Sequence, residues 1–306
     1  MRYAVIDLGS NSIRLLVADV VNGSVVPVHR ELATTRLGRG VIQNQRLDEK
    51  SMIDTLSVLI YFQNKAKSLQ SERILAFGTS ALREAKNSND FLNSAKQIGL
   101  NIKILSGQEE ALLSFLGAKA GIKQHGMTLV VDIGGNSTEL ILGESKIEKS
   151  ESLPIGAVRW TQRYFKSDPP GFDDVVEAHS AISRLLGGFA GYFNQFHMNH
   201  VITTIGVGGT LTTLSAMAQE LEIYDIKKVH GYILNKRTVD DIFSKLLSLT
   251  ADERCKLKGL QPQRADIITA GVLIAKTIME DLHITQIITS ETDIMEGYLL
   301  KNLCDN

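Results

Sequence analysis

One pattern constrains this sequence more than any other, because it occurs twice. Residues 5–17 and 130–142 align without a gap, and each consists of an apolar run ending in aspartate, a turn of small residues and a second apolar run. Glycine, asparagine and serine in such a turn allow successive backbone N–H groups to converge on an anion. The identical pairs include Asp7/Asp132, Gly9/Gly134, Asn11/Asn136, Ser12/Ser137 and Leu15/Leu140.

We interpret these segments as two copies of one strand–turn–strand unit. The alternative is two unrelated hairpins, since Asp, Asn, Gly and Ser are ordinary turn residues. Chance seldom repeats Asp-x-Gly-x-Asn-Ser behind two equally apolar strands, and we therefore favour the repeat. A carboxylate beside such a turn can hold a divalent cation while the N–H groups hold phosphate oxygens.

The apolar periodicity predicts the same order of elements after each hairpin: a third antiparallel strand, then strands that alternate with helices. This order is typical of α/β domains, so we expect two mixed sheets with helices, facing each other across a cleft. The glycine-containing stretch 121–126 is the best boundary. It divides the chain into domains 1–124 and 125–306, and the closing helix at 292–303 can pack back on the first domain.

Composition limits the kinds of protein that this chain can be. The 306 residues are 43% hydrophobic, enough for two modest cores, and a formal net charge of -1 argues against non-specific nucleic-acid binding. Cys255 and Cys304 make no disulfide framework, which fits a reducing compartment. The chain runs straight into a strand with no signal peptide, and its apolar runs are too short to cross a bilayer. We therefore expect a cytoplasmic protein with no nucleic-acid or membrane partner.

Arginines in the first domain are candidates for contact with a polyanion. Arg36, Arg39 and Arg46 lie on one polar, glycine-containing loop, although a solvated loop explains Arg39 and Arg46 equally well. Arg83 follows the strand expected at 73–77, at the carboxyl edge where open α/β sheets bind ligands. Pairing with a carboxylate on its own helix is the alternative for Arg83.

Two adjacent glutamates have different expected tasks. Ser106 and Glu109 have the spacing of a capping box, in which the two side chains satisfy backbone N–H groups at the start of a helix. Glu110 has no such task and is available to point into a cleft. We therefore expect Glu109 to be structural and Glu110 to do chemistry, with a solvated helix position as the alternative for Glu110.

The second domain adds a third candidate anion site. Residues 206–210 form a glycine-rich turn between a strand and a helix, and the N-terminus of a helix attracts anions. A long helix is expected from 261 to 282, with Arg264 near its start. Gly187 and Gly188 are expected to mark a point of close helix packing.

Together these motifs resemble the exopolyphosphatase / guanosine pentaphosphate phosphohydrolase (Ppx/GppA) family, within the actin, Hsp70 and sugar kinase superfamily. The resemblance covers nearly the whole chain and rests on the segments 4–12, 78–85, 106–111, 132–140 and 206–210. Asp-Leu-Gly-Ser-Asn-Ser joined to Ser-Gly-x-Glu-Glu-Ala is specific to that family. The family implies two ribonuclease H-like domains, Mg²⁺ with Mn²⁺ as an alternative, and hydrolysis of a terminal phosphoanhydride.

The resemblance also implies roles for individual residues. Glu110 matches the general base that activates the attacking water. Asp132 and Glu139 match acidic residues at the metal and phosphate site, and Asp7 is a third candidate metal ligand. The residues implied to bind phosphate are Ser10, Asn11, Ser12, Arg83, Gly134, Gly135, Asn136, Ser137, Thr138, Gly208 and Gly209.

Two features depart from the family pattern. A third glycine usually stands where this chain has Asn136, so one backbone approach is expected to be tighter. Longer members continue into an HD-type domain and a C-terminal domain, whereas this sequence stops after two domains. We therefore do not expect a substrate channel that spans a dimer or strong processivity, although a homodimer is compatible with the resemblance.

The leading interpretation is an exopolyphosphatase that releases orthophosphate from inorganic polyphosphate. The alternatives are a phosphohydrolase that converts pppGpp to ppGpp, a catalytically weak nucleotide or polyphosphate sensor, and a sugar or acetate-type kinase. Arg36, Arg39 and Arg83 favour a long polyanion. Only 6% of the chain is aromatic, and the lone Trp160 is expected in the core, which leaves no evident stretch to stack a guanine.

Overall fold

The chain folds into two compact units. The computed structural model describes residues 1–123, 125–198 and 200–304. One unit comprises residues 1–117 and the segment from 294 onward, and the other comprises residues 118–293. The predicted domain boundary after residue 124 lies outside the described residues. The closing helix, α13 (Ile294–Cys304), clusters with the first unit.

The sheet of the first unit has five strands in the order β3-β2-β1-β4-β5. Their bounds are β1 (Arg2–Leu8), β2 (Ile13–Val21), β3 (Ser24–Ala33), β4 (Arg73–Gly78) and β5 (Ile102–Ile104). The first three strands form an antiparallel meander because short turns connect them, whereas β4 and β5 run parallel to β1. Parallel pairing needs longer crossovers. These contain α2 (Glu49–Ser68) and α4 (Ser88–Gln97).

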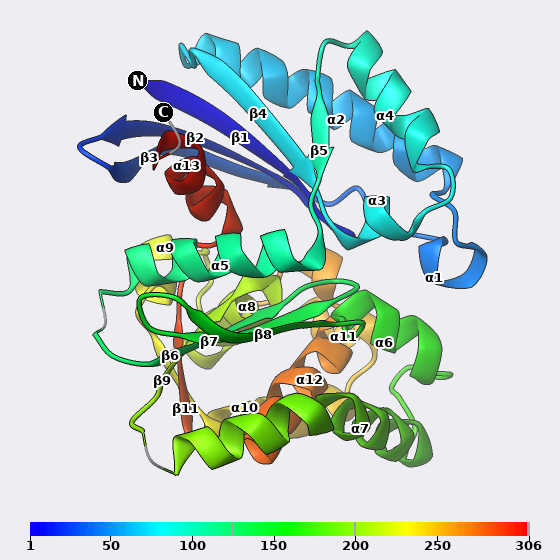
Figure 1. Cartoon of the computed structure of the whole chain (residues 1–306). Coiled ribbons are helices and arrows are strands. Elements are labelled where there is room, and N and C mark those ends of the chain that lie inside the picture. Colours follow the sequence, from blue (N-terminus) through cyan, green and yellow to red (C-terminus); the bar gives the residue numbers. More distant parts are fainter. Residues whose placement is uncertain (124, 199, 305–306) are drawn as a thin grey trace. The chain divides into compact units, whose positions relative to one another are not determined.

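Both faces of this sheet are covered. Successive residues of β1 are apolar, so the strand must be buried on both of its faces. Ala4, Ile6 and Leu8 pack in one core cluster with residues of α2 and α4. Tyr3 and Val5 point to the opposite face and pack with residues of α13. Figure 1 shows α2 and α4 together on one side of the sheet and α13 on the other.

The sheet of the second unit has six strands in the order β10-β11-β9-β6-β7-β8. Their bounds are β6 (Thr128–Ile133), β7 (Thr138–Gly143), β8 (Ile147–Leu153), β9 (Thr203–Val207), β10 (Ile233–Asn235) and β11 (Gln286–Thr289). The first three strands again form an antiparallel meander, β9 and β11 continue the sheet in parallel, and β10 is an antiparallel edge strand. The predicted α/β fold with two mixed sheets of ribonuclease H-like topology is thereby confirmed.

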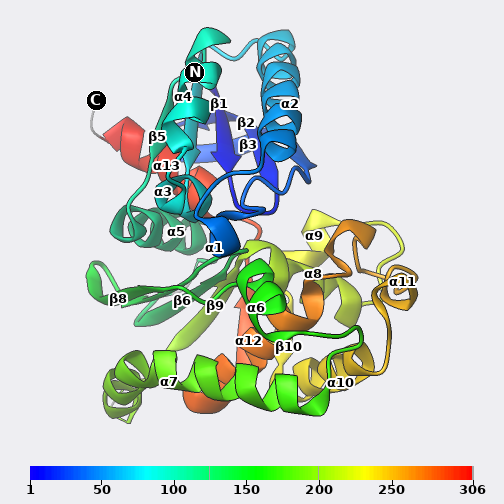
Figure 2. The same ribbon diagram turned by 90° about the vertical axis from the view of Figure 1, so that its right-hand side faces the viewer.

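Helices bury one face of the second sheet in the largest core cluster of the described residues. The helices that contribute to it are α6 (Ala157–Tyr164), α7 (Phe172–His197), α8 (Gly208–Ala218), α10 (Lys236–Leu247) and α12 (Ile268–Asp281). Figure 2 shows α7 and α10 on the same side of the strands. Trp160 lies in this core, as predicted, and its indole Nε1 donates a hydrogen bond to the Ala178 carbonyl at 3.2 Å.

The remaining helices connect these elements. They are α1 (Val41–Asn44), α3 (Ser80–Glu84), α5 (Gly107–Gly121), α9 (Ile226–Val229), α11 (Ala251–Arg254) and the 3₁₀ helix Pro262–Arg264. Among the described residues, no helix is both long and apolar enough to cross a membrane.

Two expectations about helices were wrong. The helix expected from 261 to 282 is interrupted: a 3₁₀ turn ends at Arg264, and α12 begins only at Ile268. Gly187 and Gly188 do not mark close packing, because a Cβ atom built on either glycine meets nothing within 4 Å. Both lie on the exposed face of α7, together with Gly191.

These exposed glycines yield a stability prediction. Glycine in a helix interior is less favourable than alanine by about 1 kcal/mol. Because a methyl group at Gly187 or Gly191 has open space, Gly187→Ala and Gly191→Ala should each raise the free energy of unfolding by that amount in denaturant titrations. Gly297→Ala is the contrasting variant, since its Cβ would overlap the carbonyl oxygen of Leu113, and it should destabilise the protein. Equal effects of Gly187→Ala and Gly297→Ala would contradict this account.

Candidate functional site

The two copies of the repeated motif close their turns with the same hydrogen bond. The Gly9 N–H donates to the Ser12 carbonyl at 3.1 Å, and the Gly134 N–H donates to the Ser137 carbonyl at 3.0 Å. Each turn joins the first two antiparallel strands of its sheet. In both copies an aspartate lies near the end of the first strand, just before the turn. The repeat seen in the sequence is therefore a repeat in three dimensions.

Different elements support the two turns. In the first unit, the Ser10 carbonyl accepts from the Gly38 N–H at 2.8 Å, and the Asn11 carbonyl accepts from the Arg36 N–H at 2.9 Å. The Ser10 hydroxyl also lies 3.1 Å from the hydroxyl of Ser80, the first residue of α3. The loop that carries Arg36 thus buttresses the first turn through its backbone.

In the second unit, the start of α6 supports the turn. The N–H groups of Ala157 and Val158 donate to the carbonyls of Gly134 and Gly135 at 3.0 and 2.8 Å. The guanidinium of Arg159 then donates from Nε to the Asn136 carbonyl at 2.8 Å. Gly156 directly precedes α6. A side chain at this position would overlap the backbone of the turn, which is why glycine stands there.

These supports orient the backbone N–H groups of the turns. In a planar trans peptide, a carbonyl and the N–H of the next residue point in opposite directions. Because the carbonyls of Gly134, Gly135 and Asn136 point toward α6, the next N–H groups point away from it. The same holds for the N–H groups that follow Ser10 and Asn11 in the first unit. Each turn therefore presents N–H groups in the manner of an anion-binding nest.

The residue that faces the aspartate differs between the two copies. Asp7 lies opposite Arg14 on the neighbouring strand and accepts from its Nε at 2.9 Å and its Nη2 at 2.5 Å. Asp132 lies opposite Glu139, so the second copy sets two carboxylates side by side. Glu139 is 1% exposed and accepts from the Ser152 hydroxyl at 2.7 Å. The first copy is thus an ion pair, and the second is an acidic pair.

The acidic pair fits a magnesium ion better than the ion pair does. Mg²⁺ takes oxygen ligands and is usually held by one or two carboxylates, with water and substrate phosphates completing its shell. Asp132 and Glu139 supply two such carboxylates, and no group of three or more potential ligands occurs among the described residues. Gly208 lies against the Asp132 carboxylate, with no room there for a side chain. Because Arg14 already neutralises Asp7, Asp7 is the weakest of the three predicted ligands.

The glycine-rich turn of the second unit is also placed in the site. Gly208 has a left-handed φ of 84° and is the first residue of α8. The guanidinium of Arg264 packs directly on Gly209, so a positive charge lies over the N-terminus of this helix. Helix N-termini and guanidinium groups both attract phosphate. Arg264 is the last residue of the 3₁₀ turn that precedes α12.

The predicted general base, Glu110, lies in the first unit and is paired with an arginine. Glu110 is 7% exposed and accepts from Arg83 Nη1 at 3.1 Å. Arg83 also donates to the Leu105 carbonyl at 2.7 Å, which holds the guanidinium beside Glu110. Arg83 lies three residues after Ser80 on α3. This short helix therefore contacts the first turn through Ser80 and Glu110 through Arg83.

Glu109 has the structural role that the sequence predicts. Its carboxylate accepts from the Ser106 N–H at 2.9 Å, and its own N–H donates to the Ser106 hydroxyl at 3.2 Å. Lys103 donates to the same carboxylate at 2.7 Å. The hydrogen bond from Lys103, followed by that from Ser106, lowers the pKa of Glu109 to about 2.

Sequence reasoning missed three arginines. Arg14 faces Asp7, Arg159 holds the Asn136 carbonyl, and Arg264 covers Gly209. Arg14 lies inside the first copy of the repeat, where strand pairing places it opposite Asp7. Arg159 and Arg264 lie outside the repeat, and tertiary packing brings each to its turn. Asn136 shows another unexpected feature: it is 1% exposed, and neither polar atom of its side chain has a hydrogen-bond partner.

The lowered pKa of Glu109 predicts a pH-dependent contribution to stability. A carboxylate whose pKa is depressed on folding stabilises the protein above its unfolded value near 4.5, and the contribution is lost as pH falls toward 2. Because Lys103 is 54% and Glu109 32% exposed, the pair should be worth about 0.5 kcal/mol. Glu109→Gln should therefore be less stable than the parent at pH 7, with the difference shrinking at pH 3. A difference that persists unchanged at pH 3 in urea titrations would contradict it.

The chain is similar to known proteins over nearly its whole length. The Ppx/GppA phosphatase family matches residues 16–305. Exopolyphosphatase 2 of Mycobacterium tuberculosis is 33% identical over 314 residues, covering 98% of each chain. A guanosine-5'-triphosphate,3'-diphosphate pyrophosphatase of Aliivibrio fischeri is 33% identical over 96% of this chain, but the match spans 58% of that longer protein. Among solved structures, an exopolyphosphatase from Cytophaga hutchinsonii superposes with a TM-score of 0.90 at 27% identity, covering 100% of this chain and 98% of that one.

Proposed function

The chain belongs to the Ppx/GppA phosphatase family, and from this membership we propose that it is an exopolyphosphatase. The reaction would hydrolyse the terminal phosphoanhydride bond of inorganic polyphosphate and release orthophosphate. The observation that carries the proposal is the pair of turns closed by the same bond, each with backbone N–H groups directed away from its support. Phosphate oxygens are the ligands that turns of this kind recognise.

Phosphate binding is assigned to residues within each unit. In the first unit, Ser10, Asn11 and Ser12 form the nest, and all three are less than 10% exposed, so their contacts to phosphate would be made in a largely dry environment. In the second unit, residues 134–138 form the other nest, and the turn at Gly208–Gly209 adds a helix N-terminus under Arg264. The charges of the arginines and the helix end oppose the negative charge of the terminal phosphoryl group.

Asp132 and Glu139 are the residues that would hold Mg²⁺, with Mn²⁺ as the alternative. When bound, the cation would neutralise charge on the phosphoryl oxygens during transfer. Burial of Glu139 and its hydrogen bond from Ser152 fix the orientation of that carboxylate before any ligand arrives. Such preorganisation is what electrostatic stabilisation of a transition state requires.

Glu110 is assigned the general base. Its carboxylate would take a proton from a water molecule as the water oxygen attacks the terminal phosphorus, while the bridging oxygen leaves with the shortened chain. Arg83 holds this carboxylate at 3.1 Å and is itself fixed by the Leu105 carbonyl, so Arg83 is a positioning residue for Glu110. We therefore assign Arg83 a role in positioning Glu110, in addition to the contact with polyphosphate that the family resemblance implies.

The second candidate function is hydrolysis of pppGpp to ppGpp. It breaks the same kind of bond, and a relative with the name of that activity is 33% identical over 96% of this chain. A polyphosphate or nucleotide sensor with weak catalysis is the third candidate. The three candidate functions differ in whether phosphate is released and in which substrate releases it. Each of these two properties can be measured directly.

Phosphate release tests the function and the base together. The protein should release orthophosphate from long-chain polyphosphate in a Mg²⁺-dependent manner, and Glu110→Gln should lower kcat by about 10²–10⁴-fold, the usual worth of a general base. Glu109→Gln is the matched control, because its side chain can still cap α5, and it should keep most activity. Equal losses in the two variants would remove Glu110 from the chemistry. Release from pppGpp but not from polyphosphate would favour the second candidate.

The metal assignment predicts a change in the Mg²⁺ requirement. Asp132→Asn should raise the Mg²⁺ concentration needed for the half-maximal rate, because a carboxylate ligand or its water bridge is lost. Asp7→Asn should leave that concentration unchanged even where it lowers the rate, since Arg14 occupies the Asp7 carboxylate. An equal shift in both Mg²⁺ titrations would show that Asp7 is also a ligand, and no shift for Asp132→Asn would remove Asp132 from the metal site.

A further inference from the structure

The side chain of Asn136, in the second turn, is buried without a hydrogen-bond partner. The residue is 1% exposed, and among the described residues neither its Oδ1 nor its Nδ2 atom has a partner. Burying an amide in this state costs free energy, because both groups are hydrogen-bonded to water in the unfolded chain. An unpaired amide that a folded protein retains at such a cost points to a partner that arrives from outside the chain.

Local structure gives no reason for an asparagine at this position. Asparagine is common in turns because it tolerates a positive φ or because its side chain bonds to nearby backbone groups. Asn136 is not among the described residues with a positive φ, and its side chain makes no such bond to them. Its backbone carbonyl accepts from Arg159, but that contact needs no particular side chain. The fold of the turn therefore does not depend on the amide.

The first copy of the repeat shows the same residue with a structural task. Asn11 is the counterpart of Asn136, and its Nδ2 donates to the Ser12 hydroxyl at 3.1 Å. The equivalent bond from Asn136 to the Ser137 hydroxyl is not made. Two asparagines at matched positions of one motif therefore differ, and the one in the second copy keeps its amide unengaged.

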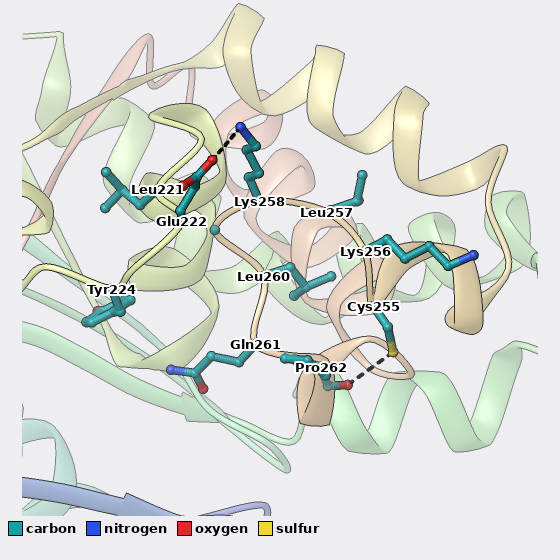
Figure 3. Close-up of a pocket in the computed structure, with 11 residues that line it drawn as sticks. Leu221, Glu222, Tyr224, Cys255, Lys256, Leu257, Lys258, Leu260, Gln261 and Pro262 are labelled. Atoms are coloured by element: carbon teal, nitrogen blue, oxygen red, sulfur yellow. Dashed lines mark hydrogen bonds and ion pairs between the residues drawn. The ribbon is translucent and has the colours of Figure 1, made fainter.

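A cavity of about 430 Å³ in the same unit does not share this feature. It lies beside the chain that joins α11 to the 3₁₀ turn (Figure 3). Lys258 is bridged to Glu222 at 2.8 Å, and the Cys255 thiol donates to the Pro262 carbonyl at 3.6 Å. Within the described part of the chain, none of the buried side-chain atoms without a partner belongs to the cavity lining. Unmet hydrogen-bonding capacity therefore lies at the turn and not in the cavity.

The surroundings of Asn136 favour a phosphoryl oxygen as the missing partner. Residues 134–138 form the second nest, whose backbone N–H groups attract an anion, and Nδ2 is one further donor at the same place. Because no hydrogen bond holds the amide, rotation about its side-chain bonds toward a ligand breaks none. Phosphates also bring ordered water, from which Oδ1 can accept.

We propose that the side chain of Asn136 binds the substrate directly, by donating from Nδ2 to a phosphoryl oxygen held in the second turn. The inference rests on the proposed phosphate site, and it adds a side-chain contact to the backbone contacts assigned there. The family pattern has glycine at this position, so the contact is not part of that pattern. Asn136 lowers the stability of the unliganded protein and raises its affinity for phosphate.

Equilibrium binding of tripolyphosphate in Mg²⁺ tests the contact. The Glu110→Gln protein is the background, so that the ligand is not consumed. Adding Asn136→Leu, which keeps nearly the same shape without a donor, should raise the Kd roughly 10- to 150-fold, the worth of a hydrogen bond to a charged group. Asn136→Gly should raise it similarly, and it decides the matter if the leucine variant does not fold. An unchanged Kd in either folded variant, or no binding by the Glu110→Gln protein, would overturn the proposal.

Thermal unfolding is a second readout, which a merely structural amide would not produce. Without ligand, Asn136→Leu should have a higher Tm than the parent, because two unpaired polar groups are replaced by apolar groups of similar shape. Asn11→Leu is the matched control and should have a lower Tm, because it breaks the bond to Ser12. Saturating tripolyphosphate should raise the Tm of the Glu110→Gln protein more than that of its Asn136→Leu variant. An unliganded Tm of Asn136→Leu at or below the parent value would contradict the inference.

The result for Asn136 is separable from the result for the proposed activity. Phosphate release from polyphosphate by the parent, together with an unchanged Kd in the Asn136 variants, would remove this inference alone. A raised Kd in those variants, without phosphate release by the parent, would support the contact and remove the proposed hydrolase function.

Discussion

The hydrogen bond that closes each repeated turn is the constraint on which the rest of the site depends. The bond from Gly9 to Ser12, and its counterpart from Gly134 to Ser137, joins the ends of two paired strands directly after an aspartate. Strand pairing fixes what lies opposite that aspartate, and packing against neighbouring elements fixes which way the next N–H groups point. The direction of the N–H groups therefore follows from backbone geometry, and the side chains decide what each copy adds.

The two copies of the repeated motif have the same closing hydrogen bond but differ in the charge of the residue that faces the aspartate. Asp7 faces Arg14, so the charge of the first copy is satisfied within the protein. Asp132 faces the buried Glu139, and two adjacent carboxylates repel each other unless a cation or hydrogen bonds compensate them. The second copy therefore carries a carboxylate on each of its two strands, where the first carries an ion pair. Arg83 provides the equivalent compensation for buried Glu110 and, by holding it, restricts the directions from which that carboxylate can accept a proton.

The two ends of α8 have different surroundings. The N-terminal end carries the glycine turn and Arg264, and both a helix N-terminus and a guanidinium group favour anions. Near the other end of the helix, Gly259 packs on the backbone of Ala216.

The sequence by itself determined the fold class, the two-fold repeat, the turn residues and the capping role of Glu109, because each depends on periodicity or on neighbours a few residues away. Local motifs and family resemblance also made Asp132, Glu139 and Glu110 candidate site residues. Only the tertiary structure decided that Arg14 neutralises Asp7, that Arg83 pairs with Glu110, and that Arg264 covers Gly209. These contacts join residues from different elements, or depend on strand register, and the break before α12 moved Arg264 off the helix expected for it. Charge pairing between distant segments depends on packing, and no local pattern encodes it.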